Sequence, residues 1–256
     1  MTNIDWFKGR TAIVTGASSG MGSAIALALG RAGANVGINY NRNQAAAEAI
    51  KEEIDSAGGS GLVLQANVGD PEHVERMFTT VDETFGGKLD MIVCNAGEWM
   101  EKNPVVECPL SEWDQMIRVN ATSVFLCCQQ AARRMIPQGE GAIVTVGSVA
   151  GHTGGGGGTV PYAAAKSAVH TFTRGLAREL APHGIRVNGF APGVVDTPMQ
   201  EGRATPEVAA LLNKLTPVGR MGQADEVVDL ALLLLSPGSS FMAGEIVEIN
   251  GGLLMR

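Results

Sequence analysis

Short apolar, β-branched runs alternate with longer Ala-rich or amphipathic stretches along the chain. The short runs have the length and residue types of buried strands, and the longer stretches have helical spacing. Such alternation is typical of a parallel sheet covered by helices on both faces. Seven strands are predicted, at residues 11–15, 35–40, 61–66, 91–95, 142–147, 186–191 and 245–249. Helices are predicted at residues 20–32, 43–57, 71–85, 110–136, 160–182 and 223–236.

The alternation runs without a linker or an internal repeat, so one domain accounts for residues 1–256. A chain of this length buries one substantial core, and α/β folds of this size often form a single domain. The only low-complexity segment is the glycine run Gly154–Gly158. It is predicted to be a flexible loop between the fifth strand and the following helix.

Composition and charge narrow the classes of function. Hydrophobic residues make up 45% and charged residues 18%, as in ordinary soluble globular proteins. The net charge of -7 argues against non-specific nucleic-acid binding, which needs a basic face. No apolar run reaches the ~18 residues of a membrane span, and the first ten residues lack the apolar core of a secretory signal. We therefore expect a cytoplasmic protein with neither nucleic acid nor membrane as a partner.

The cysteines predict no metal site. Cys94, Cys108, Cys127 and Cys128 fit no zinc-binding spacing, and the adjacent pair lies in an apolar helical stretch. We expect them to be reduced, buried and without a metal.

A glycine-rich turn follows the first predicted strand. Residues 15–22 read T-G-A-S-S-G-M-G and open an Ala-rich helix. The glycines permit a tight turn, close approach of a phosphate and close helix packing, and the helix N-terminus attracts a pyrophosphate. The turn therefore predicts a doubly wound Rossmann fold that binds a dinucleotide. The candidate contacts in the turn are Gly16, Ser18, Ser19, Gly20, Met21 and Gly22.

The end of the second strand indicates which dinucleotide is bound. Folds that prefer NAD usually place a carboxylate there for the ribose hydroxyls. Residues 39–42 read N-Y-N-R instead, and the Arg42 guanidinium suits a 2′-phosphate. The alternative is that Arg42 is a solvated charge at a helix start. The pattern favours NADP(H) over NAD(H) and makes Tyr40, Asn41 and Arg42 candidate contacts.

Tyr162 and Lys166 are four residues apart in P-Y-A-A-A-K and share one face of a helix. A phenol ionises near pH ~10, and a neighbouring cation lowers that value towards neutrality. A tyrosine with a lowered pKa exchanges protons readily with an alcohol or a carbonyl. Ser148, which ends the fifth apolar run, is placed to hold the reacting oxygen. Because Y-x-x-x-K alone is common, an accidental pair is the competing interpretation.

Several side chains directly follow predicted strands. In open parallel sheets, ligands bind beyond the carboxyl ends of the strands. Asn95, Ser148 and Pro192 hold such positions, so they are expected to meet at one edge of the sheet.

Together these motifs resemble the short-chain dehydrogenase/reductase family over essentially the whole chain. The matching segments are Thr15-Gly16-x3-Gly20-x-Gly22, Cys94-Asn95-Ala96-Gly97, Asn120 in R-V-N, the set Ser148, Tyr162 and Lys166, and Pro192-Gly193 with Thr197. The resemblance implies an NAD(P)(H)-dependent oxidoreductase that interconverts a ketone and a secondary alcohol by hydride transfer.

The resemblance also implies a role for each catalytic residue. Tyr162 would be the general acid/base, and Lys166 would lower its pKa and bind the nicotinamide ribose. Ser148 would hold and polarise the substrate oxygen, an oxyanion-type role. Asn120 would keep a water that relays protons from Lys166.

The implied cofactor contacts extend beyond the glycine turn. Asn95, Ala96 and Gly97 would pass close to the adenosine ribose. Thr197 would bond the carboxamide, in a stretch with Pro192, Gly193 and Val195 beside the nicotinamide.

The chain departs from the family pattern at three places. Cys94 replaces the first Asn of N-N-A-G, and Asn67-Val68 stands where Asp usually contacts adenine. Asn67 keeps a carbonyl acceptor, so the adenine contact can survive without the charge. Tyr162 follows Ser148 by fourteen residues, about one more than is commonest, and the glycine run can absorb the extra residue.

The substrate pocket is harder to define. His152 is either a substrate contact or an ordinary loop histidine, and Trp99 and Met100 either line the pocket or simply pack. The segment from Met199 to about residue 216 matches the family's lid. Within it, T-P-E-V-A-A-L-L-N-K-L predicts a short helix with a Thr cap.

Three identities stay open. A 3-oxoacyl-[acyl-carrier-protein] reductase would dock an acidic carrier, but P-Q-G-E-G and A-P-H-G-I near the entrance are acidic or neutral, leaving Arg133, Arg134 and Arg174 as contacts. A sugar or polyol dehydrogenase, resembling the glucose 1-dehydrogenase group, is equally compatible. A non-catalytic dinucleotide sensor is the distant alternative, because it has no reason to keep the whole catalytic set.

The resemblance implies a homotetramer formed through the helices near 110–136 and 160–182 and through the last strand. The first of these helices carries more apolar residues, around Val124–Cys128, than one buried stripe needs.

Overall fold

The structure is a computed structural model that describes residues 4–99, 103–198 and 205–255. Its centre is a seven-stranded parallel sheet in the order β3-β2-β1-β4-β5-β6-β9. The strands are β1 (Thr11–Val14), β2 (Asn35–Tyr40), β3 (Ser60–Gln65), β4 (Met91–Cys94), β5 (Gly141–Val146), β6 (Ile185–Pro192) and β9 (Ile246–Ile249). The strand order reverses between β1 and β4, which confirms the doubly wound Rossmann fold and its seven strands.

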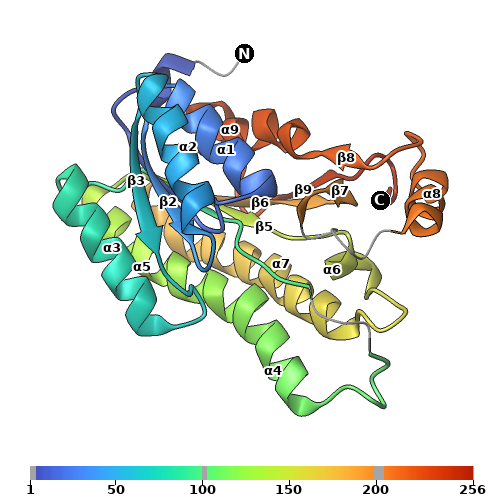
Figure 1. Cartoon of the computed structure of the whole chain (residues 1–256). Helices are drawn as coiled ribbons and strands as arrows, with labels where there is room; N and C mark the ends of the chain where they lie inside the picture. Colours follow the sequence, from blue (N-terminus) through green and yellow to red (C-terminus); the bar gives the residue numbers. More distant parts are fainter. Residues whose placement is uncertain (1–3, 100–102, 199–204, 256) are drawn as a thin grey trace.

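Helices cover both faces of the sheet, as the alternation predicted (Figure 1). One face carries α1 (Gly20–Arg31), α2 (Gln44–Ser56) and α9 (Val228–Leu235). The other carries α3 (Pro71–Phe85), α5 (Ser123–Gln138) and α7 (Val160–Leu180). Every residue of β1 and β4 is buried, which explains why these central strands read as unbroken apolar runs.

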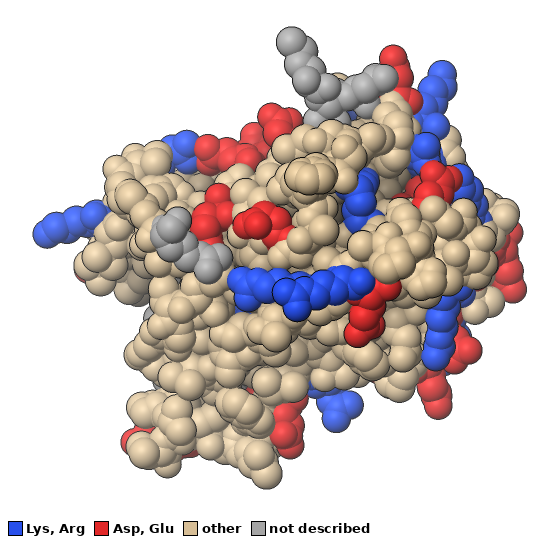
Figure 2. All heavy atoms as spheres, turned by 180° about the vertical axis from the view of Figure 1, so that it is seen from behind, with Lys and Arg blue, Asp and Glu red and all other residues tan. Residues whose placement is uncertain are grey.

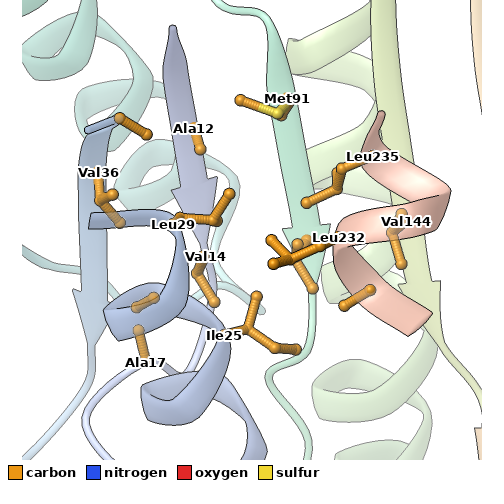
Figure 3. Packing of buried hydrophobic residues seen from close by; sticks show 14 of the residues in the cluster. Ala12, Val14, Ala17, Ile25, Leu29, Val36, Met91, Val144, Leu232 and Leu235 are labelled. Carbon is orange, nitrogen blue, oxygen red and sulfur yellow. The ribbon is translucent and has the colours of Figure 1, made fainter. Parts of the chain in front are cut away.

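The sheet separates two hydrophobic cores. In the first, Ile25 and Leu29 of α1 and Leu232 and Leu235 of α9 point onto the strands side by side (Figure 3). In the second, α3, α5 and α7 pack against the opposite side of the same strands. The two cores hold the glycine turn and the Tyr162 helix in one rigid frame.

The helix predicted at 110–136 is interrupted. It consists of α4 (Leu110–Ile117), a π-helical turn (Arg118–Thr122) and α5, which runs on to Gln138. The Asn120 amide donates to the carbonyl of Met116 at 3.1 Å, so this side chain ties the irregular turn to α4. A π turn is rare and is often found at a functional site.

Smaller elements surround the carboxyl ends of the strands. The predicted lid helix is α8 (Pro206–Leu215), whose cap Thr205 accepts from the amide of Val208. The residues Gly154–Gly158 form the predicted loop, and all five have positive φ. The predictions missed α6 (Ala150–Thr153), a parallel pair formed by β7 (Val195–Asp196) and β8 (Gly222–Gln223), and 3-10 turns at Ile4–Phe7, Ala181–His183, Ala224–Val227 and Pro237–Ser239.

The described surface carries charges of both signs. On the face opposite to the view of Figure 1, acidic and basic side chains are interspersed (Figure 2). Among the described residues, no helix is long and apolar enough to cross a membrane. The same part of the chain contains no cluster of three His, Cys, Asp or Glu side chains that could hold a metal.

Candidate active site

The glycine turn is held by a buried asparagine. Gly16 adopts φ 63°, a left-handed conformation that favours glycine, and its N–H donates to Asn39 Oδ1 at 3.1 Å. The Asn39 amide donates to the carbonyls of Leu64 and Ala66 at 3.2 and 3.1 Å. Asn39 therefore ties the turn to the ends of β2 and β3. The position of Asn39 at the end of a strand was a sequence signal for this role, but the role was not predicted.

Gly22 and Asn95 bring the first helix close to the turn. A Cβ on Gly22 would lie 2.4 Å from the Gly16 oxygen and 2.5 Å from Asn95 Nδ2. The Asn95 amide donates to the Thr15 carbonyl at 2.9 Å. Gly22 thus serves helix packing, and Asn95 braces the turn with its side chain.

A cleft of about 490 Å³ opens beyond the turn. Its described lining includes these expected cofactor contacts: Gly16, Ser18, Ser19, Gly20, Met21, Asn41, Arg42, Asn67, Val68, Asn95, Ala96, Gly97 and Thr197. The size of the cleft, the left-handed turn and the free helix N-terminus fit a dinucleotide.

Some expected contacts lie elsewhere. The side chain of Tyr40 is only 4% exposed and packs in the first core, so it does not line the cleft. The alternation along β2 turns it inward, away from the ligand side. Gly193 and Val195 line a separate cavity of about 120 Å³, and Pro192 is buried with its carbonyl bonded to the amide of Val149.

Arg42 lies at the cleft, but it already has an acidic partner. Its guanidinium bonds the Glu98 carboxylate at 3.0 Å, and its side chain is 79% exposed. Glu98 follows the N-A-G segment directly and was missed. The sequence signal for this ion pair was an acidic residue directly after N-A-G, in a chain whose Arg42 is predicted to bind phosphate.

Ser148, Tyr162 and Lys166 meet at the ends of β5 and α7, as predicted. Ser148 is buried and hydrogen-bonds the Tyr162 hydroxyl. The Lys166 ammonium lies 5.7 Å from the centre of the Tyr162 ring and donates to the Val146 carbonyl at 2.9 Å. These three residues bring together a proton donor, a second hydroxyl and a buried cation.

The electrostatics differ from the expectation for the tyrosine. Burial raises the pKa of Tyr162 above its usual value near 10, and the hydrogen bond from Ser148 opposes that shift in part. Burial also lowers the pKa of Lys166 to about 8. The expected lowering of the Tyr162 pKa by Lys166 is therefore wrong for this structure, because burial of the phenol is the largest influence and the opposing influence comes from Ser148.

Asn120 is fully buried in the π-helical turn and bonds the loop that follows β4. Its amide donates to the Glu98 carbonyl at 2.8 Å, and its oxygen accepts from the Glu98 N–H at 3.2 Å. This two-way contact holds the backbone that follows Gly97. A Cβ on Gly97 would lie 2.8 Å from Asn120 Oδ1 and 3.5 Å from Lys166 Nζ, so Asn120 and Lys166 flank the same point.

Trp99 lines a small pocket beside the phenol. The indole stacks on the Tyr162 ring, with 5.4 Å between centroids and 10° between planes. The other lining residues are Asn103, Cys108, Glu112, Met116, Gly158, Thr159, Pro161 and Tyr162. Cys94, Cys127 and Cys128 are buried as predicted, whereas Cys108 is partly exposed in this pocket. Met100 and Met199 lie outside the described residues.

His152 does not behave as an ordinary loop histidine. It belongs to α6, and its Nε2 lies 2.9 Å from Glu248 Oε1. Its ring packs against His170, whose Nε2 accepts from the N–H of Ser148 at 3.3 Å. His170 was missed, although its four-residue step beyond Lys166 places it on the face of α7 that carries the catalytic pair.

Comparison with known proteins extends these observations. Residues 16–254 match the family model described as enoyl-(acyl carrier protein) reductase. The chain is 38% identical over 249 residues to the 3-oxoacyl-[acyl-carrier-protein] reductase FabG of Escherichia coli, covering 97% of this chain and 99% of that protein.

Two solved structures are also similar. A putative gluconate dehydrogenase from Agrobacterium tumefaciens superposes with a TM-score of 0.92 at 33% identity, covering 98% of each chain. A short-chain type dehydrogenase/reductase from Mycobacterium marinum superposes with a TM-score of 0.90 at 35% identity, covering 99% of this chain and 100% of that one.

Proposed function

Because the chain belongs to the short-chain dehydrogenase/reductase family and is an oxidoreductase acting on CH–OH groups, we propose that it interconverts a ketone and a secondary alcohol, with NADP(H) preferred over NAD(H). The observation that carries this proposal is the convergence of Ser148, Tyr162 and Lys166 beside the cleft. The dinucleotide, when bound, would supply or accept the hydride.

The side chains divide the remaining work. In the reductive direction, Tyr162 donates its phenolic proton to the carbonyl oxygen as that oxygen gains charge. Ser148 donates a hydrogen bond to the same oxygen and holds it against the phenol. The raised pKa of Tyr162 keeps the phenol protonated near neutral pH, which suits this direction.

Lys166 returns the proton that Tyr162 gives up. Its pKa of about 8 lies close to neutrality, so the ammonium can release a proton under ordinary conditions. Asn120 lies beside it, bonded to the loop after β4, where it would hold a relay water. The route to solvent thus runs past Lys166 and Asn120.

The NADP(H) preference rests on Arg42 and on the loop after β2. The residues that line the cleft there, Asn41, Arg42 and Asn43, include no carboxylate that would repel a 2′-phosphate. A phosphate that binds Arg42 would replace Glu98 as the partner of the guanidinium.

Among substrates, we favour a ketone with an apolar group beside the carbonyl, as in a 3-oxoacyl thioester. Trp99, Met116 and Pro161 form apolar walls at the phenol. The carrier-docking role expected for Arg134 is not supported, because its guanidinium binds Asp82 and lies over the Phe78 ring. Arg133 and Arg174 are exposed and are the basic contacts that a carrier would use. Asn103 and Glu112 in the same pocket offer polar groups for a sugar or polyol, the second candidate.

The decisive experiment uses both tyrosines of the chain. Tyr162→Phe should lower turnover roughly 10²- to 10⁴-fold while NADPH binding stays nearly unchanged. Tyr40→Phe is the matched control, because Tyr40 is buried in the first core. Turnover would be measured over ketones, sugars and acyl thioesters with NADPH and NADH in parallel. A wild type that binds NADPH yet reduces none of them would favour the dinucleotide sensor.

We further propose a cytoplasmic homotetramer built through α5 and α7. Phe125 is 44% exposed and meets Phe172 edge to face, with 6.1 Å between ring centroids. The two rings border an apolar hollow of about 260 Å³ with Ala121, Thr122, Ala168 and Val169. Light scattering should give a tetramer for the wild type and smaller species for Phe125→Glu, and a monomeric wild type would refute the assembly.

A further inference from the structure

Two imidazole rings lie behind the catalytic serine. His152 of α6 and His170 of α7 have ring centroids 4.1 Å apart and planes tilted by 34°. On one side, His152 Nε2 pairs with the carboxylate of Glu248 in β9 at 2.9 Å. On the other side, the Ser148 N–H donates to His170 Nε2 at 3.3 Å. These two polar contacts, with the packed imidazole rings between them, connect the last strand to the backbone of Ser148.

The inner ring is tightly enclosed. His170 is 2% exposed, and the side chains of His152 and Glu248 are 10% and 21% exposed. A Cβ on Gly147 would lie 2.2 Å from His170 Nε2, and one on Gly151 would lie 2.6 Å from His170 Cε1. The imidazole thus touches the backbone on both sides of Ser148, which fixes the position of the serine loop relative to α7.

The same face of α7 carries the catalytic pair. Tyr162, Lys166 and His170 are spaced by four residues, so consecutive turns present a phenol, an ammonium and an imidazole. The proposed mechanism uses the first two and leaves the third without a role.

We propose that His170 is a positioning residue that holds Ser148 against Tyr162, and that His152 and Glu248 hold His170 in the required state. The inference rests on the proposed role of Ser148 in binding the substrate oxygen. Accepting from the Ser148 N–H needs the lone pair of Nε2, so His170 must be neutral, with its proton on Nδ1. A protonated His170 has two donors and no acceptor, and its Nε2–H would then face the Ser148 N–H and push the serine away.

The charged neighbours of His170 come from each packed element. Within the part of the chain that the structure describes, they include His152 on α6, Glu248 on β9 and Lys166 on α7 itself. The Glu248 carboxylate stabilises a positive charge on His152, and a charged His152 disfavours a second charge on the neighbouring His170 ring. The outer pair therefore protects the acceptor that Ser148 uses.

The test separates hydrogen bonding from simple packing. Glutamine at position 170 offers an amide oxygen near the Nε2 position but does not titrate, whereas leucine offers no acceptor. At pH 8, His170→Gln should keep kcat for carbonyl reduction within about threefold, and His170→Leu should lower it roughly 10- to 100-fold with little change in NADPH binding. His183→Gln, at an exposed site, is the matched control.

The pH dependence of kcat distinguishes hydrogen bonding from packing, because a purely structural role of His170 would leave it unchanged. In the wild type, kcat should decrease at acidic pH as His170 is protonated. In His170→Gln, this decrease should be absent. Glu248→Gln leaves His170 intact and should move the fall to higher pH, because His152 no longer competes for the proton. Acid limbs that are the same in all three proteins would overturn the proposal.

A second measurement does not depend on turnover. The chain has four histidines, so ¹⁵N spectra with single substitutions can assign His170. We expect the Nδ1-protonated form at pH 8, and an Nε2-protonated His170 would overturn the inference. If no carbonyl is reduced, the proposed function fails, and these spectra still decide whether His170 accepts from Ser148.

Discussion

The indole of Trp99 lies almost parallel to the phenol of Tyr162, with 10° between the two planes. Trp99 comes from the loop after β4 and Tyr162 from the first turns of α7, so two distant segments enclose the proton donor. Burial is the main cause of the raised pKa of Tyr162, and the stacked indole contributes to that burial. By covering the phenol, Trp99 therefore also favours the protonated form of Tyr162.

Removing the indole should change the pH dependence of the reaction. In Trp99→Ala, water reaches the phenol and its pKa falls. Reduction needs the protonated phenol, so its loss of rate on the alkaline side should move to lower pH. Oxidation needs the phenolate and should begin at lower pH as well. The pH profile of kcat in both directions measures this, with Trp113→Ala on α4 as control, and an unmoved alkaline limb would contradict the argument.

The ion pair between Arg42 and Glu98 should limit the preference for NADPH. Arg42→Ala removes a charged partner of the 2′-phosphate and should weaken NADPH binding roughly 10- to 100-fold, with little effect on NADH. Glu98→Gln frees the arginine from its carboxylate and should tighten NADPH binding by about two- to fivefold, because exposed pairs are weak.

Both effects can be measured by fluorescence titration without any substrate. Combining the two substitutions should abolish the gain from Glu98→Gln. Equal effects of Arg42→Ala on NADPH and NADH would refute the role of the arginine.

The buried ammonium of Lys166 should lower the free energy of unfolding at neutral pH. Its folded pKa, about 8, is below the usual 10.5, so the buried charge is unfavourable whenever both states are protonated, below pH 8. Stability should rise as the pH increases from 8 towards 10.5, where the folded state loses its proton first. Lys166→Met should therefore stabilise the fold by about 1–3 kcal/mol at pH 7, after allowing for the lost bond to Val146.

Urea unfolding at pH 7 and pH 10 measures this effect, and the gain should shrink at the higher pH. The matched control is Lys214→Met, because Lys214 is exposed on α8. A destabilised Lys166→Met at pH 7 would show that the buried ammonium is favourable in the fold.

Substitution by alanine should have opposite effects on stability at two glycines that lie in helices. At Gly22 the new Cβ meets the Gly16 carbonyl at 2.4 Å, so Gly22→Ala should cost about 1–3 kcal/mol and weaken NADPH binding. At Gly175, within α7, a Cβ has no heavy atom within 4 Å, and Gly175→Ala should stabilise by about 0.5–1 kcal/mol. Thermal melts with and without NADPH distinguish the two, and a Gly22→Ala protein with wild-type melting would contradict the packing.

The sequence predicted the seven strands within one or two residues because parallel strands buried on both faces leave long apolar signals. It also predicted the convergence of Ser148, Tyr162 and Lys166, since strand ends and helical spacing determine where those residues lie. It did not predict the direction of the Tyr162 pKa shift, which depends on how deeply the ring is covered. The inward position of Tyr40 and the pairing of Arg42 with Glu98 were missed because both depend on contacts between residues far apart in the sequence.

The π-helical turn at Arg118–Thr122 has a consequence for the phase of the helix that contains it. A π turn holds one residue more than the α-helix that it replaces, and each residue of an α-helix advances the side chains by about 100°. The apolar faces of α4 and α5 therefore point in different directions. As a result, α4 borders the substrate pocket while α5 packs into the second core. Deleting one residue in this turn would restore regular helical geometry and rotate one of the two segments out of its proper contacts.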